Sequence, residues 1–309
     1  MASSPALLSL GEPLIEFNRP KEGDGRTWLQ GFGGDSQNVV IAAARQGATT
    51  GYFTSLGQDW MGDAFLDLWR SEGVDVAHVG RHPSAPTGVS FVTHGPAGHK
   101  FDYLRKNSAA SLMAPEALPS DYIAGAKYFH LSAIGQAISE SARAAGDAAI
   151  AIARKGGAKV SYDTNLRLRL WDLDTARAKI NATIPLCDIL LPSLDDSQQL
   201  TGLQNPDAIA DFYLGLGAPL VALKMGAEGS LIATRDGRHR LAPYKVAAVD
   251  ATGAGDTFDG SFLSRLLEGD DPVAAGRYAN VAAALSTTGY GAVTPIPRKE
   301  AVLEALRRG

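Results

Sequence analysis

From about residue 120 onward, short apolar runs alternate with stretches in which apolar residues recur at helical spacing. The runs predict buried strands, and the stretches between them predict helices. The predicted strands are Tyr128–Leu131, Lys159–Asp163, Asp188–Pro192 and Leu220–Lys224, and the predicted helices are Ser139–Lys155, Asp174–Thr183 and Pro206–Leu214. Repeated strand–helix units form a parallel sheet with helices on both faces. We therefore predict a doubly wound, mostly parallel α/β fold.

The first third of the chain has apolar runs that few helices separate. Helical spacing occurs at Asn38–Gln46 and Asp63–Glu72, whereas residues 18–31 are polar and glycine-rich, which is typical of an exposed loop. The predicted strands are Ala6–Leu10, Leu14–Phe17, Thr49–Leu56, Val74–Val79, Gly88–Thr93 and His99–Leu104, with a hairpin turn at Gly95–Gly98 between the last two. This pattern predicts a small antiparallel sheet that stands apart, and we expect it to form a lid from about residues 12–32 and 87–107.

The C-terminal third is predicted to be mainly helical. Its predicted elements are a hairpin of Ser230–Thr234 and His239–Ala242 and the helices Asp256–Glu268, Pro272–Thr288 and Arg298–Arg307. The chain has 309 residues, of which 45% are hydrophobic, so it can bury one large core. We find no internal repeat or linker and treat residues 1–309 as a single domain.

Charge and cysteine content exclude several classes of function. The net charge is −4 and no dense Lys/Arg run occurs, so a nucleic-acid partner is not expected. Cys187 is the only cysteine, so no disulfide within the chain ties it to an oxidising compartment. The first residues lack a signal-peptide pattern, and no window is apolar enough to span a membrane. We expect a cytoplasmic protein without a membrane partner.

The segment Asp250–Phe258 carries the most distinctive chemistry of the chain. It follows the apolar run Val246–Val249 and opens a predicted helix, and Gly253 and Gly255 leave its backbone N–H groups uncovered. A helix N-terminus with bare amides stabilises a phosphate by hydrogen bonds and by the helix dipole. The sequence lacks both the Walker pattern and the dinucleotide-binding glycine pattern, so those two phosphate sites are excluded.

Asp256 stands in the middle of this anion-binding turn, where a carboxylate repels phosphate. One interpretation is that Asp256 removes a proton from a hydroxyl that attacks next to the anion. The alternative is that Asp256 is the N-cap of the helix. The glycines on both sides favour the catalytic interpretation.

Several motifs together resemble the ribokinase-like (PfkB) family of carbohydrate kinases. They are DATGAGDTFDG at 250–260, GFGGDSQNVVIAAARQG at 31–47, SLGQDWMGDAFLDLWRSEGVDV at 55–76 and LKMGAEGSL at 223–231. Within this family the chain is most similar to the 2-keto-3-deoxygluconate kinases. That similarity is carried by Gly-Glu-Pro at 11–13, FDYLRKNSAAS at 101–111 and SYDTNLRLRLW at 161–171.

The resemblance implies a sugar site and a role for each matching residue. The substrate would be bound by Gly33, Gly34, Asp35, Gln37, Asn38, Tyr103, Arg105, Arg167 and Asp256. On the predicted strand Phe101, Tyr103 and Arg105 share one face, and arginine grips carboxylates in a bidentate way, which suits a sugar acid. Without the resemblance, the Gly33–Asn38 segment could be a helix cap and Arg105 a solvated residue of an edge strand.

The resemblance also implies a nucleotide site. ATP would be bound by Asn165, Arg167, Ser193, Lys224, Gly226, Glu228, Gly229, Thr252, Gly253, Gly255 and Asn280. The amides of Gly253, Ala254, Gly255 and Asp256 would face the transferring phosphoryl group. Taken alone, Lys224 could be a surface charge and Asn280 a neutral helix residue.

One departure from the family pattern affects the metal site. The family carries Asn-x-x-Glu after the strand placed at 188–192, whereas this chain has Ser193-Leu194-Asp195-Asp196. We expect Asp196 to hold Mg²⁺ through a water, with Asp195 as the alternative. The resemblance also leaves room for an activating monovalent cation.

These observations lead to one predicted reaction and two alternatives. The predicted reaction is ATP-dependent phosphorylation of 2-keto-3-deoxygluconate at its terminal hydroxyl, giving 2-keto-3-deoxy-6-phosphogluconate, with Asp256 as the base. The first alternative is a kinase of a neutral sugar such as fructose or ribose. The second is a sugar-acid sensor without catalysis. The resemblance further implies a homo-oligomer formed through the lid.

Overall fold

The structure is a computed structural model that describes residues 4–20, 24–95 and 98–308. Its main sheet contains β1 (Leu7–Leu10), β4 (Thr50–Phe53), β9 (Tyr128–Ser132), β10 (Lys159–Asp163), β11 (Ile189–Leu190), β12 (Leu220–Lys224), β13 (Ser230–Thr234) and β14 (Arg238–Leu241). The order across the sheet is β14-β13-β12-β11-β10-β9-β1-β4. Strands from β4 to β12 run parallel, and β13 and β14 form an antiparallel hairpin at one edge.

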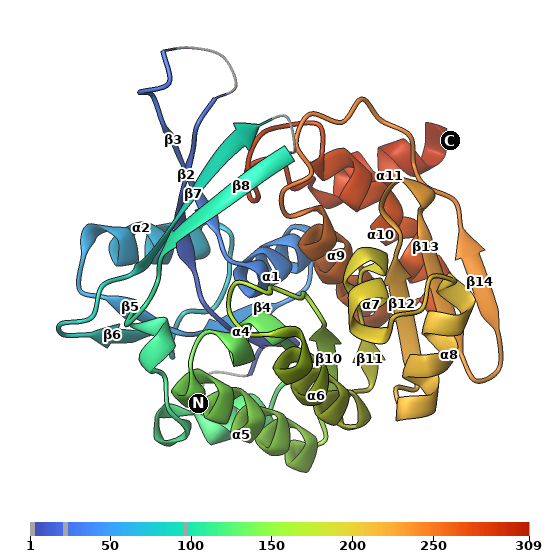
Figure 1. Ribbon diagram of the computed structural model, residues 1–309, viewed down its shortest axis with the longest axis horizontal. Coiled ribbons are helices and arrows are strands. Elements are labelled where there is room, and N and C mark those ends of the chain that lie inside the picture. The colour runs from blue at the N-terminus through green and yellow to red at the C-terminus, as the bar shows by residue number, and fades with distance from the viewer. Residues whose placement is uncertain (1–3, 21–23, 96–97, 309) are drawn as a thin grey trace.

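Helices cover both faces of this sheet (Figure 1). One face packs against α5 (Glu140–Gly156), α6 (Leu173–Thr183) and α8 (Pro206–Leu216), and the other against α1 (Asp35–Arg45), α9 (Ala254–Glu268) and α10 (Pro272–Ser286). Successive strand residues point to opposite faces, so Leu8 joins the first core and Leu7 the second. The predicted doubly wound α/β fold is confirmed.

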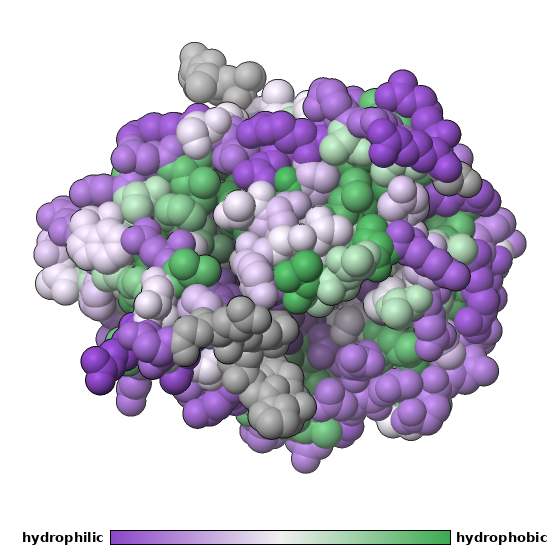
Figure 2. All heavy atoms as spheres, turned by 90° about the horizontal axis from the view of Figure 1, so that it is seen from above, coloured by the Kyte–Doolittle hydropathy of each residue, from purple (hydrophilic) through white to green (hydrophobic). Residues whose placement is uncertain are grey.

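The remaining helices are short or peripheral. They are α2 (Trp60–Ser71), α3 (Ser120–Ala124), α4 (Ala133–Ala137), α7 (Leu194–Thr201) and α11 (Lys299–Arg308), with 3-10 turns at Ala110–Leu112, Pro115–Ala117, Ile184–Leu186 and Gly226–Glu228. Among the described residues, no helix is long and apolar enough to cross a membrane. Hydrophilic side chains cover most of the face in Figure 2, with smaller hydrophobic patches between them.

A second sheet stands apart from the main one, as predicted. We call it the lid sheet; it contains β2 (Leu14–Asn18), β3 (Leu29–Gly33), β7 (Gly88–Gly95) and β8 (Gly98–Leu104) in the order β3-β2-β7-β8. The prediction that it is antiparallel is wrong in one place, because β2 and β7 are parallel. A chain that leaves the lid sheet after β3 and re-enters it at β7 can pair in either direction. Residues 21–23 of the predicted lid and 96–97 of the predicted hairpin turn lie outside the described residues.

Three local predictions in the first third are wrong. Val74–Val79 forms only an isolated parallel bridge, from Asp75 to Gly51 of β4: the Val74 N–H closes a turn on the Trp69 carbonyl, and the valines pack against α2. Their apolar pattern therefore reflects helix packing. The predicted strand Thr49–Leu56 is divided into β4 and β5 (Ser55–Gly57), and β5 pairs with β6 (Gly80–His82). Residues 29–31, predicted as loop, belong to β3. Outside the first third, the helix α7 was not predicted.

Gly260 lets α9 pack directly against α1. A Cβ atom at this position would lie 2.7 Å from the Ala42 Cβ and still closer to the Val39 carbonyl oxygen. Both neighbours belong to α1 and neither can move without shifting the helix. Glycine at 260 therefore sets the distance between these two helices.

We expect Gly260→Ala to lower the free energy of unfolding by about 1–3 kcal/mol, because the added methyl group overpacks the helix contact. Chemical denaturation monitored by circular dichroism measures this change. The matched control is Gly215→Ala on α8, where a Cβ would meet nothing within 4 Å. That exposed helical position should gain roughly 0.5–1 kcal/mol from the same substitution. Equal effects at both positions would contradict the packing argument.

Candidate active site

A cavity of about 1160 Å³ lies between the lid sheet and the main sheet. Its walls include Leu14, Glu16, Ser90 and Tyr103 from the lid sheet, and the carboxyl ends of β10 and β12. The first turn of α9 also faces this cavity. In open parallel sheets, ligands bind at the carboxyl ends of the strands, so the fold favours this cavity as the active site.

The glycine turn that precedes α9 is held in place by Asp250. Its Oδ1 accepts hydrogen bonds from the Thr252 N–H (3.0 Å) and hydroxyl (2.7 Å), and its Oδ2 accepts one from the Gly291 N–H (3.0 Å). Gly253 is the N-cap with φ 75°, a left-handed conformation that favours glycine. The first amides of a helix lack partners inside it, so the turn presents donors to the cavity that Gly253, Ala254 and Gly255 line, although the Ala254 N–H already bonds to the Ala251 carbonyl (3.2 Å).

Asp256 is not the cap of α9, so the N-cap interpretation is wrong. Its carboxylate instead accepts a 2.7 Å hydrogen bond from the Asn38 side-chain amide and lines the cavity. Burial raises the pKa of Asp256 to about 7, and the nearby Asp35 carboxylate adds to the effect. A carboxylate with a pKa near neutrality is well matched to proton transfer at physiological pH.

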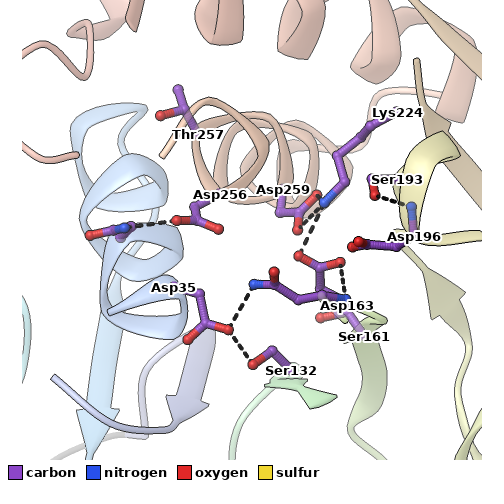
Figure 3. A network of polar contacts seen from close by, with 12 residues as sticks. Asp35, Ser132, Ser161, Asp163, Ser193, Asp196, Lys224, Asp256, Thr257 and Asp259 are labelled. Atoms are coloured by element: carbon purple, nitrogen blue, oxygen red, sulfur yellow. Dashed lines mark hydrogen bonds and ion pairs between the residues drawn. The ribbon is translucent and has the colours of Figure 1, made fainter. Parts of the chain in front are cut away.

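The predicted sugar-site segment on α1 reaches the cavity except at one residue. Gly33, Gly34, Asp35 and Asn38 line it, and Asp35 accepts hydrogen bonds from the Ser132 hydroxyl and the Asn165 amide (3.0 Å) (Figure 3). Gln37 is fully buried away from the cavity, where it accepts a hydrogen bond from Trp69 and donates one to Asn38. The prediction that Gln37 binds substrate is therefore wrong, because helical geometry turns its side chain toward α2.

Arg105 is not a solvated residue of an edge strand. Its guanidinium forms an ion pair with the buried Glu12 and lies 5.0 Å from the centre of the Tyr103 ring. Glu12 also accepts a 2.9 Å hydrogen bond from the Ser108 hydroxyl. Burial raises the pKa of Glu12 although Arg105 opposes the shift. Arg105 and Tyr103 both line the cavity, and their contact with a substrate stays a prediction.

The loop after β10 and the start of α7, which follows β11, bring further polar groups to the cavity. Asn165, Arg167, Ser193, Asp195 and Asp196 all line it. Arg167 is exposed and, within the described part of the chain, forms no ion pair; its guanidinium donates to the Leu166 carbonyl (2.8 Å).

Of the two adjacent carboxylates, Asp196 is the more enclosed. It accepts a 3.1 Å hydrogen bond from the Leu166 N–H, and burial raises its pKa, whereas Asp195 is exposed.

All but one of the predicted nucleotide-binding residues line the cavity. Lys224, Gly226, Gly229, Thr252 and Asn280 line the cavity, but Glu228 does not, although it belongs to the same 3-10 turn as Gly226. The Asn280 amide donates to the Ala242 carbonyl (3.1 Å). Lys224 is no surface charge: its ammonium bonds to Asp163 (3.1 Å) and to both oxygens of Asp259 (2.9 Å each).

Sequence reasoning missed four acidic residues of this site. Glu12 and Glu16 come from the connection into the lid sheet and from β2, and Asp163 and Asp259 hold Lys224. Asp163 could have been found, since it ends a predicted parallel strand where ligands bind. Asp259 offered no such signal, because it reads as an ordinary helical residue one turn after Asp256.

Comparison with known proteins agrees with this geometry. The model of the pfkB family carbohydrate kinases matches residues 5–299. The chain belongs to this family. It is therefore a phosphotransferase that acts on a sugar hydroxyl, which leaves the sensor alternative without support.

Individual relatives differ in substrate. The chain is 35% identical to the 2-dehydro-3-deoxygluconokinase of Thermoproteus tenax, with 97% of this chain and 95% of the relative covered. It is 33% identical to fructokinase-1 of Oryza sativa, with 98% of each covered. The crystal structure of a Vibrio cholerae fructokinase in its fructose-, ADP- and calcium-bound form superposes with a TM-score of 0.88 at 28% identity, covering 97% of this chain and 99% of that one. The ribokinase-like fold is thus confirmed, and the family members similar to this chain include kinases of acid and neutral sugars.

Glu16 should make a large contribution to the change of the free energy of unfolding with pH. Burial, with repulsion from Asp250, raises the pKa of Glu16 to about 7 from 4.5. The folded state therefore prefers the protonated acid, and it loses stability as pH rises from the unfolded to the folded pKa. Glu16→Gln should raise the free energy of unfolding by about 2–3 kcal/mol relative to wild type at about pH 8, and change it little near pH 4.5.

Denaturant unfolding at both pH values measures this difference. The matched control is Glu116→Gln, which changes an exposed acid of the same type and should have the same small effect at both pH values. A gain for Glu16→Gln that is equal at the two pH values would show that folding does not raise the pKa of Glu16.

Proposed function

We propose that this protein transfers the γ-phosphoryl group of ATP to the terminal hydroxyl of 2-keto-3-deoxygluconate, giving 2-keto-3-deoxy-6-phosphogluconate and ADP. The observation that carries the proposal is the position of Asp256, whose carboxylate faces the cavity beside the bare amides of α9. A base next to an anion site is the arrangement that phosphoryl transfer to an alcohol requires.

The chemistry follows from this pair of groups. Asp256 takes the proton of the hydroxyl, whose oxygen forms the new bond to the γ-phosphorus as the bond to the ADP oxygen breaks. The amides at Gly253–Asp256 and the dipole of α9 stabilise the charge on the phosphoryl group. Asn38 holds the carboxylate in place through its 2.7 Å hydrogen bond. The lid sheet would exclude water and thereby limit ATP hydrolysis.

The residues present fit a magnesium ion that arrives with the nucleotide. Among the described residues, no group of three or more acidic, histidine or cysteine side chains could hold a metal alone. Mg²⁺ is usually bound by substrate phosphates, waters and one or two carboxylates. Asp196 provides such a carboxylate at the cavity wall and would hold the ion through a water. The ion would neutralise charge on the phosphates.

Two arginines support an acidic substrate, though not equally. Arg167 lines the cavity and attracts Asp196 electrostatically, but in the described ranges it forms no direct ion pair, so its guanidinium can reach a substrate carboxylate. Arg105 is already paired with Glu12 and would share its guanidinium between that carboxylate and the substrate. We therefore expect Arg167 to contribute more than Arg105 to recognition of the acid.

A neutral sugar such as fructose is the second candidate substrate. It is favoured by the acidic groups of the cavity, since Glu12, Glu16, Asp35 and Asp256 all line it and suit hydroxyl groups better than a carboxylate.

We also propose, from the resemblance to the family, that the chain forms a homo-oligomer through the lid sheet, whose edge strands are β3 and β8.

A coupled assay of ADP release over a panel of sugars and sugar acids tests this function. We expect the highest kcat/KM with 2-keto-3-deoxygluconate, and loss of at least about 100-fold in kcat for Asp256→Asn with retained substrate binding, since only the base is removed. Calorimetric titration of the variant with sugar and nucleotide is the control. Preference for fructose would replace the substrate assignment, and near-normal turnover of Asp256→Asn would remove the base.

Arg167→Ala separates the two substrate classes. A charge-assisted bond is worth about 1.5–3 kcal/mol, so kcat/KM for 2-keto-3-deoxygluconate should fall roughly 10–100-fold while that for fructose changes little. The matched control is Arg169→Ala, because Arg169 reaches Asp102 and the Phe101 carbonyl on the lid sheet. Arg169→Ala should affect both substrates alike. An equal loss on both substrates for Arg167→Ala would contradict a carboxylate contact.

A further inference from the structure

Three charged residues meet behind the first turn of α9 (Figure 3). Lys224 ends β12, Asp163 ends β10, and Asp259 lies on α9 one turn after Asp256. The Lys224 ammonium is 3.1 Å from Asp163 and 2.9 Å from both oxygens of Asp259. The Asp259 side chain is fully buried, and those of Asp163 and Lys224 are 6% and 11% exposed. The three residues therefore form a desolvated ion cluster that joins two strands of the sheet to the helix.

The position of this cluster links it to the anion-binding turn. The Lys224 ammonium lies 3.6 Å from the point where a Cβ at Gly255 would stand, so it touches the turn from the side of the sheet. An ammonium has three N–H donors, and here it makes three hydrogen bonds to carboxylate oxygens. None is left for a phosphate in this arrangement, which speaks against the predicted role of Lys224 as an ATP ligand.

We propose that Lys224 and Asp259 are positioning residues: Asp259 holds the Lys224 ammonium against the first turn of α9, and the ammonium keeps the neighbouring Asp256 carboxylate ionised for proton removal. This inference rests on the proposed function, in which Asp256 is the base. It assigns to the pair an indirect role through Asp256, without contact to either substrate.

The charges around Asp256 explain why such a cation is needed. The carboxylates that face it are Asp35 from α1, Asp163 from β10 and Asp259 from its own helix, and the cation is Lys224 from β12. Burial raises the pKa of Asp256, Asp35 and Asp163 add to the shift, and Asn38 and Lys224 oppose it. Among the described residues, Lys224 is the cation that opposes these carboxylates at the base.

The cation itself is kept charged by the two carboxylates. Burial acts to lower the pKa of Lys224, but Asp163 and Asp259 outweigh it, so the pKa is raised. Burial raises the pKa of Asp259, and Lys224 opposes that shift. Since the carboxylates of Asp259 and Asp256 repel each other, substitutions at Lys224 and Asp259 should change the ionisation of Asp256 in opposite directions.

The test compares pH profiles and nucleotide binding for Lys224→Met and Asp259→Asn. In Lys224→Met, the acid limb of kcat/KM should move up by about one pH unit and kcat near pH 7 should fall roughly fivefold, with recovery at higher pH. In Asp259→Asn, the acid limb should move to lower pH. The affinity for a non-hydrolysable ATP analogue, measured by calorimetry, should stay within about threefold in both.

The opposite result would assign Lys224 to the nucleotide. If Lys224→Met weakens binding of the ATP analogue at least about tenfold and leaves the acid limb unmoved, Lys224 contacts phosphate and the proposal is overturned. Lys224→Met leaves two carboxylates buried without their cation and could unfold the protein. In that event Asp259→Asn decides: an acid limb that moves to lower pH supports the proposal, and an unmoved acid limb rejects it.

The wild-type enzyme distinguishes this inference from the function on which it rests. Turnover of any sugar in the panel, with Asp256→Asn inactive, establishes the kinase and its base. Unshifted acid limbs would then overturn the role of Lys224 and Asp259 alone. Absence of turnover on every sugar would instead overturn the proposed function.

Discussion

The contact between α1 and α9 is the constraint on which the rest of the site depends. The two helices approach closely because Gly260 has no side chain to separate them. This approach brings Asn38 of α1 to the carboxylate of Asp256 and places the first turn of α9 at the cavity. A wider spacing would leave the Asp256 carboxylate without its hydrogen bond from Asn38. The packing of the two helices therefore determines the geometry of the polar site.

The pKa values of the acidic residues in this site depend on two opposing effects, burial and the charge of Lys224. Several carboxylates gather at one end of the sheet, and desolvation raises the pKa of Glu12, Glu16, Asp196 and Asp256. At Asp256 the Lys224 ammonium opposes this rise in pKa from the side of the sheet. Such clustering costs stability, because each buried charge loses solvation. In the proposed reaction, the same desolvation makes the Asp256 carboxylate a stronger base toward the sugar hydroxyl.

The lid sheet and the main sheet contribute different chemistry to the cavity. The main domain contributes the strand ends and the first turn of α9 with Asp256, the proposed base. The lid sheet provides Tyr103 and Arg105, while Arg167 comes from a loop that faces it. Substrate choice therefore depends on the surfaces that meet across the cavity. This division agrees with relatives of similar identity that carry the names of two different sugar kinases.

The sequence by itself determined the doubly wound fold, the separate lid sheet and the glycine turn with Asp256, because hydrophobic period and glycine chemistry are local properties of the chain. It did not determine the parallel pairing of β2 with β7, the inward turn of Gln37, or the partners of Lys224 and Arg105. Those features join residues far apart in the chain, and a side chain's partner depends on which elements pack beside it. Only the tertiary structure decides that packing, and with it which charges are buried together.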